Sequence, residues 1–362
     1  MTNPHAGGRI EASVVVCTRN RAAILPRALE TLAAQVTGRA FEIVVVDNAS
    51  EDETHDVIAE WCQRDARFRG VAEPQLGLSR AKNAGVANAR GEILLFTDDD
   101  VLVAPEWVEA HVGLLAGRRD LVISGGTVIP IPSDLSPWPD WLGEGTLVDL
   151  PMLDHGPPPR PLARWEQVWG ANMAMPRDVF ARVGAWNEDL GRKGDERGTW
   201  EDLDFAERVR RAGGEVWCCP AAVIRHRIPA ERLRPRPILR AAFRRGLDDY
   251  VKGAWARGET YPPAPPLPRR LWAFTTLVAH LARWVALALT FRFVRRRAVF
   301  DAARGAAWSA GKRMVELTMR RSAADPSDAN QSLFDDGSAG ARAITWLCFL
   351  VRRVALRSAP SA

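Results

Sequence analysis

The sequence lacks several patterns that define common classes of protein. Its five cysteines show no paired spacing, so they indicate neither a zinc site nor a disulfide framework, and we expect a reducing compartment. Residues 1–11 contain no apolar stretch and predict an N-terminal tail rather than a secretory signal. No Gly-x-Gly-x-x-Gly or Walker lysine loop follows the first predicted strand, which argues against dinucleotide and P-loop sites.

Charge is distributed unevenly along the 362 residues, whose formal net charge is +5. Residues 1–226 contain 24 Lys and Arg against 34 Asp and Glu, whereas residues 227–362 contain 25 against 10. In the basic part, arginines are interleaved with Trp, Leu, Phe and Val, which favours an anionic membrane surface over nucleic acid as a partner. We therefore expect a peripheral protein on the cytoplasmic, inner face of the plasma membrane that binds no nucleic acid.

Short apolar runs alternate with helical patterns in the acidic part. The runs at residues 13–17, 41–46 and 93–96 predict buried strands, and residues 25–35, 53–64 and 79–88 predict helices. This order is typical of a doubly wound α/β sheet. Because right-handed crossovers place the ends of parallel strands along one edge, the polar residues that follow each run should meet in one pocket.

Three consecutive carboxylates, Asp98, Asp99 and Asp100, stand where the third run ends. Like charges this close repel one another unless a cation neutralises them. Carboxylate oxygens suit Mg²⁺ or Mn²⁺, ions that commonly bridge to substrate phosphates. The triplet therefore predicts a metal site, with a solvated acidic turn as the alternative.

The basic part predicts a different architecture. We expect one domain over residues 12–228 and a basic, mainly helical, membrane-associated region over residues 229–362, beginning with a helix at 238–255. Residues 271–293 are apolar but interrupted by His280, Arg283 and Arg292. Such charges are costly at a bilayer centre, so an interfacial helix is favoured over a membrane span.

Six motifs in order resemble the family 2 glycosyltransferases, which are inverting, nucleotide-sugar-dependent enzymes with a GT-A fold. The match runs from Ala12 to His226, about 60% of the chain. It implies a mixed sheet with a Rossmann-like nucleotide-binding half. The motifs are Thr18-Arg19-Asn20-Arg21, Asp47-Asn48-x-Ser50-x-Asp52, Gly77-Leu78-Ser79-x-Ala81-x-Asn83-x-Gly85, Asp98-x-Asp100, Glu201-Asp202-x-Asp204 and Pro220 with His226.

The resemblance implies a nucleotide site in which Asp47 contacts a uracil or thymine base. For Ser50 and Asp52, capping of the following helix is an alternative, and for Arg80 and Lys82, which could pair with a diphosphate, surface ion pairs are an alternative. The expected nucleotide-binding residues are Thr18, Arg19, Asn20, Arg21, Asp47, Ser50, Arg80, Asn83, Asp98 and Asp99.

The resemblance also implies the metal ligands, the base and the acceptor side. Asp98 would approach the ribose and the ion, Asp100 would bind the ion, and His226 could be a further ligand or a structural histidine. Asp202 would take the acceptor's proton, oriented by Glu201, although capping of the helix start explains these residues too. The acceptor-side candidates, for which core packing is an alternative, are Trp169, Gly170, Asn172 and Trp200.

The predicted function is transfer of one sugar from a UDP- or dTDP-type donor to a hydroxyl of a glycan or lipid-linked acceptor, with Mg²⁺ or Mn²⁺. The Gln-x-x-Arg-Trp pattern of processive synthases is missing, which favours single addition. Two alternatives stay open: a sugar-phosphate nucleotidyltransferase, which typically has a Gly-Gly-x-Gly-Thr-Arg loop in place of Thr18–Arg21, and an inactive, membrane-associated glycan-binding scaffold.

Overall fold

A computed structural model describes residues 9–118, 122–140, 142–194, 201–256 and 297–318, together with eight residues between 276 and 287. The chain divides into two compact units, residues 1–237 and 238–362, which we describe separately. The elements of the first unit are β1 (Ala12–Thr18), α1 (Leu25–Ala33), β2 (Phe41–Asp47), α2 (Thr54–Arg64), β3 (Phe68–Ala72), α3 (Leu78–Asn88), β4 (Ile93–Asp98), β5 (Val101–Val103), α4 (Trp107–Leu115), β6 (Val122–Pro132), the 3-10 helix η1 (Glu144–Asp149), β7 (Arg160–Pro161), β8 (Asn172–Pro176), α5 (Asp178–Val183), α6 (Glu201–Arg211) and β9 (Glu215–Ile228).

These strands form one mixed sheet with the order β3-β2-β1-β4-β8-β6-β9-β5, and β7 pairs with β9. Strands β3, β2, β1 and β4 are mutually parallel. Strand β8 runs antiparallel to both β4 and β6, and β9 runs parallel to β6. The sheet therefore has a parallel half and a mixed half, which meet at β4 and β8.

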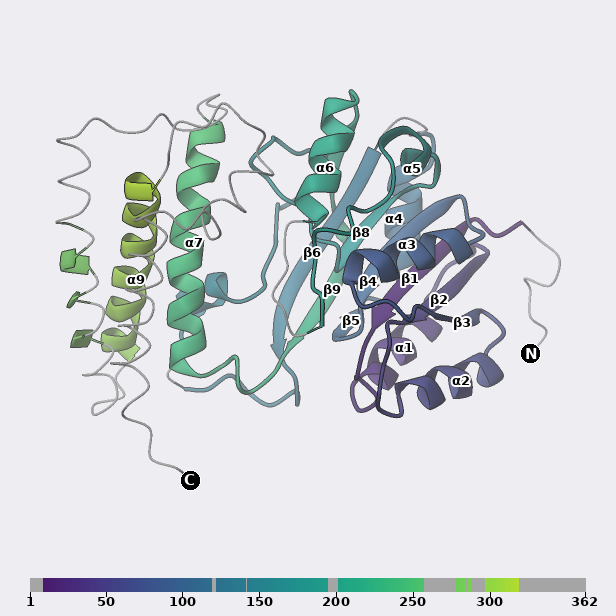
Figure 1. Cartoon of the computed structure of the whole chain (residues 1–362), viewed down its shortest axis with the longest axis horizontal. Helices are drawn as coiled ribbons and strands as arrows, with labels where there is room; N and C mark the ends of the chain where they lie inside the picture. The colour runs from purple at the N-terminus through teal and green to yellow at the C-terminus, as the bar shows by residue number, and fades with distance from the viewer. Residues whose placement is uncertain are drawn as a thin grey trace. The chain divides into compact units, whose positions relative to one another are not determined.

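Apolar side chains on both faces of the sheet explain why helices cover it from two sides. In β1, Val14 and Val16 belong to one buried cluster, which includes side chains of α1, α2 and α4. The alternate residue Val15 belongs to a second cluster with side chains of α3, α5 and α6. Helices α3 and α6 lie in front of the sheet in Figure 1. This three-layer arrangement confirms the predicted α/β class.

Close packing of α3 on the sheet depends on one glycine. A Cβ added at Gly85 would lie 2.3 Å from Val15 Cγ1 and 3.3 Å from Val46 Cγ2. Because such contacts are far inside van der Waals distance, a larger residue would push α3 away from β1 and β2. Gly85 therefore sets the depth at which α3, and Lys82 on it, sit against the strand ends.

Two strands differ from the sequence-based expectation. Strand β3 was not predicted, because its alternating burial at an edge gives only a weak apolar signal. Strand β9 was also not among the strands predicted from the three apolar runs; it runs from Glu215 through Pro220 to Ile228, with an irregular register opposite Gly126 and Thr127. A β-bulge accommodates the proline there, so His226 lies within a strand and not in a loop.

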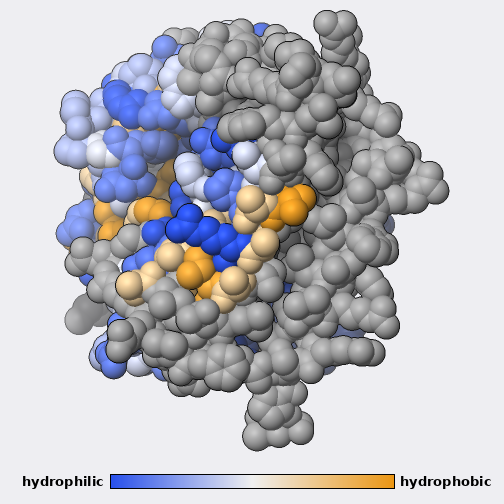
Figure 2. Space-filling model, turned by 90° about the vertical axis from the view of Figure 1, so that its left-hand side faces the viewer, coloured by the Kyte–Doolittle hydropathy of each residue, from blue (hydrophilic) through white to orange (hydrophobic). Residues whose placement is uncertain are grey.

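The second unit contains α7 (Pro235–Ala256) and α9 (Arg297–Thr318), which confirms a helix at residues 238–255. The two helices pack where Gly246 meets the Trp308 carbonyl and where Trp308 Nε1 donates to Asp249 Oδ2 at 2.9 Å. On the face in Figure 2, hydrophilic and hydrophobic residues lie next to one another. No helix among the described residues combines the length and apolar character needed to cross a membrane. The interfacial helix predicted at 271–293 falls largely outside the described residues.

Candidate active site

Three polar segments meet at the C-terminal edge of the parallel strands, as the sequence predicted. Strand pairing sets Thr18 opposite Asp47 and Cys17 opposite Asp98. Thr18 is buried at the end of β1, and Asp47 ends β2. The segments that begin at these residues therefore start within one or two strand spacings of each other.

Hydrogen bonds tie the segment after β1 to the segment after β2. The Asn20 amide donates to Ser50 Oγ at 3.0 Å, and Asn20 Oδ1 accepts from the Glu51 amide at 2.8 Å. The Arg21 amide donates to Thr54 Oγ1 at 2.8 Å. Asn20 has a positive φ of 53°, which Asn tolerates better than most residues. The capping alternative is not observed for Ser50, because its hydroxyl accepts from Asn20 and α2 begins without a side-chain cap hydrogen bond.

Asn48 has a structural role that the sequence did not reveal. Its Nδ2 donates to the carbonyls of Glu73 and Gln75 at 3.1 and 2.7 Å, and its Oδ1 accepts from the Gly77 amide at 2.9 Å. These bonds join the end of β2 to the loop that leads into α3. They fix the start of the helix that carries Lys82.

Asp98, Asp100 and His226 form a candidate metal site. One ligand atom from each lies within 4.8 Å of the others. Antiparallel pairing of β5 with β9 sets Val101 opposite His226, and His226 Nε2 lies 3.6 Å from Asp100 Oδ1. The turn after β4 and the far part of β9, 126 residues later in the chain, are brought together by this pairing.

The electrostatics of this group fit a divalent cation. Burial raises the pKa of Asp98 to about 7 and that of Asp99 to about 6, and the charge of Asp100 adds to both shifts. Burial lowers the pKa of His226, which favours the neutral imidazole that metals bind. Within the described part of the chain, buried Asp100 Oδ1 and His226 Nδ1 have no hydrogen-bond partner. Two carboxylates and an imidazole with unsatisfied atoms match the ligand set of Mn²⁺ or Mg²⁺.

Asp202 and Glu201 form a second acidic group, and this one contains its own cation. Lys82 Nζ lies 2.7 Å from Asp202 Oδ1 and 3.3 Å from Glu201 Oε1. The Gly170 amide donates to Asp202 Oδ2 at 2.7 Å. Both oxygens of Asp202 are therefore held by segments outside its own helix, which goes beyond the capping alternative.

Lys82 is buried, so its ion pair does not lie on the surface. The surface ion pair that was the alternative for this residue is therefore wrong. Burial alone would lower the pKa of its ammonium, but Asp202 and Glu201 outweigh this effect and raise it. Ser79, Lys82 and Gly85 follow one another at intervals of three residues, which puts them on one face of α3. In the sequence, the spacing of Lys82 from Ser79 and Gly85 is the signal that could have placed the lysine on the inward face of α3.

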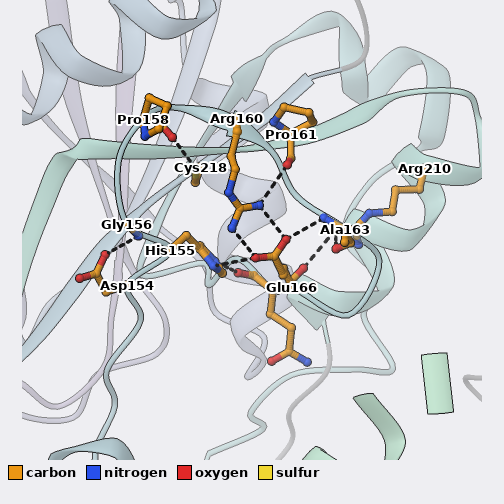
Figure 3. A network of polar contacts seen from close by, with 11 residues as sticks. Asp154, His155, Gly156, Pro158, Arg160, Pro161, Ala163, Glu166, Arg210 and Cys218 are labelled. Carbon is orange, nitrogen blue, oxygen red and sulfur yellow. Dashed lines mark hydrogen bonds and ion pairs between the residues drawn. The ribbon is translucent and has the colours of Figure 1, made fainter. Parts of the chain in front are cut away.

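A network of polar contacts fixes the loop that leads to Gly170. Arg160 binds both carboxylate oxygens of Glu166, at 2.6 and 2.8 Å, as Figure 3 shows. Arg210 Nη2, from α6, donates to the carbonyls of Ala163 and Glu166 at 3.3 and 3.2 Å. The loop is thus bound to α6 near Arg210 and again at Asp202, through Gly170.

Two predicted nucleotide ligands hold a neighbouring loop. Arg80 Nη2 lies 2.8 Å from Glu188 Oε2, so the surface ion pair is the contact observed. Asn83 Nδ2 donates to the Trp186 carbonyl at 3.0 Å, and its Oδ1 accepts from the Trp186 amide at 2.9 Å. These contacts give both residues a structural explanation. Arg19 lies beside the same region, because a Cβ added at Gly194 would be 3.6 Å from Arg19 Nη1.

The acceptor-side candidates separate in the structure. Gly170 touches the base candidate, and the partly buried Trp169 packs against the core. Asn172 is fully buried, and its amide contacts Trp107, His111 and the carbonyls of Thr127 and Ala222. A side chain with no exposure and all polar atoms engaged cannot reach an acceptor, so Asn172 is a core residue. Trp200 lies outside the described residues.

Residues 13–167 match the family model described as "Glycosyl transferase family 2". The predicted resemblance is confirmed for this part of the chain, and the mixed sheet that it implied is observed.

Relatives of the chain are named as transferases. It is 27% identical over 217 residues to the glucosyl-dolichyl phosphate glucuronosyltransferase of Haloferax volcanii, covering 57% of this chain and 65% of the relative. It is 31% identical over 229 residues to the validoxylamine A glucosyltransferase of Streptomyces hygroscopicus subsp. jinggangensis, covering 56% and 51%. The chain thus spans less than two thirds of either relative. A solved mannosyltransferase from Pyrobaculum calidifontis, in complex with GDP-Man and Mn²⁺, gives a TM-score of 0.48 at 19% identity, covering 97% of this chain and 82% of that one.

Proposed function

We propose that the protein is a metal-dependent inverting glycosyltransferase that moves one sugar from a nucleotide-sugar donor to an acceptor hydroxyl. The observation that carries this proposal is that the carboxylates of the candidate site form two separate groups. Asp98 lies beside Asp100 and His226, which each have a buried atom without a hydrogen-bond partner in the described part of the chain, while Asp202 and Glu201 already hold a buried lysine. Metal-assisted, inverting transfer from a nucleoside-diphosphate sugar uses both a cation and a base.

Asp98, Asp100 and His226 would hold the ion, and the unsatisfied buried atoms of Asp100 and His226 fit that role. A divalent ion bound there would act as a Lewis acid on the departing diphosphate. Thr18, Arg21 and Asp47 stand at the ends of β1 and β2, where a nucleoside would lie beside the ion-binding residues. Arg21 Nε is 4.0 Å from Asp99 Oδ2, so its charge is directed toward this group.

Asp202 would act as the general base. As the acceptor oxygen forms its bond to the anomeric carbon, the hydroxyl proton passes to a carboxylate oxygen of Asp202. The bond from the anomeric carbon to the diphosphate breaks on the opposite face, and its electron pair leaves with the nucleoside diphosphate. Each Asp202 oxygen accepts one hydrogen bond from the protein, so each retains a lone pair for the proton.

The donor and acceptor follow from separate considerations. Asp47 at the strand end suits the N3–H of uracil or thymine, so we propose a UDP- or dTDP-type donor. The relative from Haloferax volcanii is named for a dolichyl phosphate substrate, and residues 227–362 carry 25 Lys and Arg against 10 Asp and Glu. Both observations support a glycan or lipid-linked acceptor and a membrane surface as the place of action.

The test is nucleoside diphosphate release from UDP- and dTDP-sugars with Mn²⁺ or Mg²⁺ and candidate acceptors. We expect Asp202→Asn to lower kcat at least about 100-fold, the usual contribution of a general base. Asp100→Ala should remove the dependence on metal together with most of the activity.

The matched control is Asp204→Asn, because Asp204 lies on the same helix and pairs with Arg208. It should retain turnover close to that of the unaltered protein. Undiminished activity in both Asp202→Asn and Asp100→Ala would contradict the proposed function.

A further inference from the structure

Lys82 occupies a site enclosed by groups that attract a cation. Its side chain is 5% exposed, and its Nζ contacts Asp202 Oδ1 and Glu201 Oε1. The same Nζ lies 4.4 Å from the centre of the Trp186 ring, which presents its negative face to the ammonium. The contacts reach from α3 to the first turn of α6, so they join two elements on the same face of the sheet.

This ammonium is charged in spite of its burial. Isolated buried charges are strongly unfavourable, and a buried lysine loses its proton unless anions compensate. Here the two carboxylates outweigh the burial and raise the pKa of Lys82. The ammonium lies 2.7 Å from a carboxylate oxygen of the proposed base, so the two opposite charges compensate each other.

The position of Asp202 is fixed from its other side as well. A Cβ added at Gly170 would lie 2.5 Å from Asp202 Oδ1 and 2.7 Å from Lys82 Nζ. Only a glycine lets the backbone approach the ion pair so closely that its amide can donate to Asp202 Oδ2. The carboxylate is thus clamped between an ammonium and an amide.

We propose that Lys82 is a positioning residue for the base: it orients the Asp202 carboxylate and compensates its negative charge. This inference rests on the proposed function. Besides Lys82, the charged groups of the described residues that interact with Asp202 include Glu201 on its own helix and Asp98 on β4, and both are acidic. Lys82 is the cation that contacts this group in the described part of the chain, so its loss should leave these carboxylates without a compensating positive charge.

The experiment compares the full chain with its Lys82→Met and Lys82→Arg variants by the dependence of kcat on pH between about 5 and 9. We expect Lys82→Met to lower kcat about tenfold or more and to move the acidic limb of the profile upward by roughly one pH unit. Lys82→Arg should restore part of both. The KM for the donor, and the affinity for UDP with Mn²⁺ measured by calorimetry, should change less than about threefold.

Lys82→Met leaves two buried carboxylates without their cation, and a loss of folding would then lower activity for a different reason. Two further variants separate this effect from the proposed role. The double variant Lys82→Met/Glu201→Gln removes one charge of each sign and should still show the shifted acidic limb. Lys312→Met is the matched control, because Lys312 Nζ also lies over a tryptophan, 4.6 Å from the ring centre of Trp308, in the second unit.

The outcomes separate the inference from the function on which it rests. An unaltered protein without turnover of any donor would contradict the proposed function, and the role of Lys82 with it. An active protein whose Lys82 variants keep the original pH profile would overturn the inference alone. Weaker UDP binding with an unshifted profile would also overturn it, because Lys82 would then be a ligand of the donor.

Discussion

The candidate site contains two groups of carboxylates that differ in whether a cation of the protein compensates their charge. In the first group, Asp100 Oδ1 has no hydrogen-bond partner among the described residues, and burial raises the pKa of Asp98 to about 7. In the second group, Asp202 is held by Lys82 and by a backbone amide. In the proposed enzyme, Lys82 compensates the carboxylate of the base, whereas an ion from solution would compensate Asp98 and Asp100.

Two buried histidines repeat this contrast. His111 contacts Ser124 Oγ at 2.8 Å and Asn172 Oδ1 at 2.9 Å, so both ring nitrogens are engaged. His226 has an Nδ1 without a hydrogen-bond partner in the described part of the chain, and its Nε2 faces Asp100. Burial lowers the pKa of both rings. Engagement of the nitrogens therefore distinguishes a structural histidine from a candidate ligand, whereas burial does not.

One effect that would break the comparison concerns metal binding at the group of Asp98, Asp100 and His226. We expect Mn²⁺ to strengthen UDP binding, and chelation with EDTA to remove the gain. His226→Ala should weaken the Mn²⁺-dependent binding at least about tenfold, because an inner ligand is lost. Calorimetry of UDP binding with and without Mn²⁺ measures this. The His111→Gln variant is the control, and equal losses in the two variants would contradict the assignment of His226.

A second effect concerns Asp202, whose charge Lys82 compensates. Gly170→Ala would place a methyl group inside the Lys82–Asp202 contact and displace the carboxylate. A displacement of about 1 Å in a catalytic group can lower kcat about 100-fold, and the overpacking should cost about 1–3 kcal/mol of stability. Turnover and thermal unfolding measure the two. Gly38→Ala is the control, since nothing lies within 4 Å of the added Cβ. Equal activity in both variants would show that the clamp is not needed.

The smallest effect on activity, but a measurable one on stability, concerns His111. Its pKa is lowered by burial to about 4 in the folded chain, against about 6.5 when unfolded. The unfolded state therefore binds the proton more readily, so this stabilisation is complete above about pH 6.5 and decreases as the pH falls toward about 4. The decrease approaches roughly 3 kcal/mol.

Denaturant unfolding of the unaltered protein and of His111→Gln at several pH values isolates this contribution, because the carboxylates are common to both. The difference between their free energies of unfolding should shrink below about pH 6.5. A difference that stays constant with pH would contradict a neutral, buried His111.

Local patterns were enough to predict the framework of the site. The strands that end near Thr18, Asp47 and Asp98 were each predicted from a short apolar run followed by polar residues, and parallel topology requires such ends to share an edge. Strand β3 was missed because its pattern is weak at an edge. Roles for single polar residues were less predictable. In the sequence, Asn172 and Arg80 are equally suited to bind a ligand or to bind other residues of the protein, and only the contacts in the structure distinguish the two roles.

The positions of three strands along the chain, the charge asymmetry and the identity of the acidic residues were determined by the sequence alone, because they follow from side-chain chemistry and from short-range periodicity. Only the tertiary structure decided which charges compensate one another. Lys82 and Asp202 are 120 positions apart in the chain, and Asp100 and His226 are 126 apart. Contacts at such separations depend on helix packing depth and strand register, which no local pattern specifies.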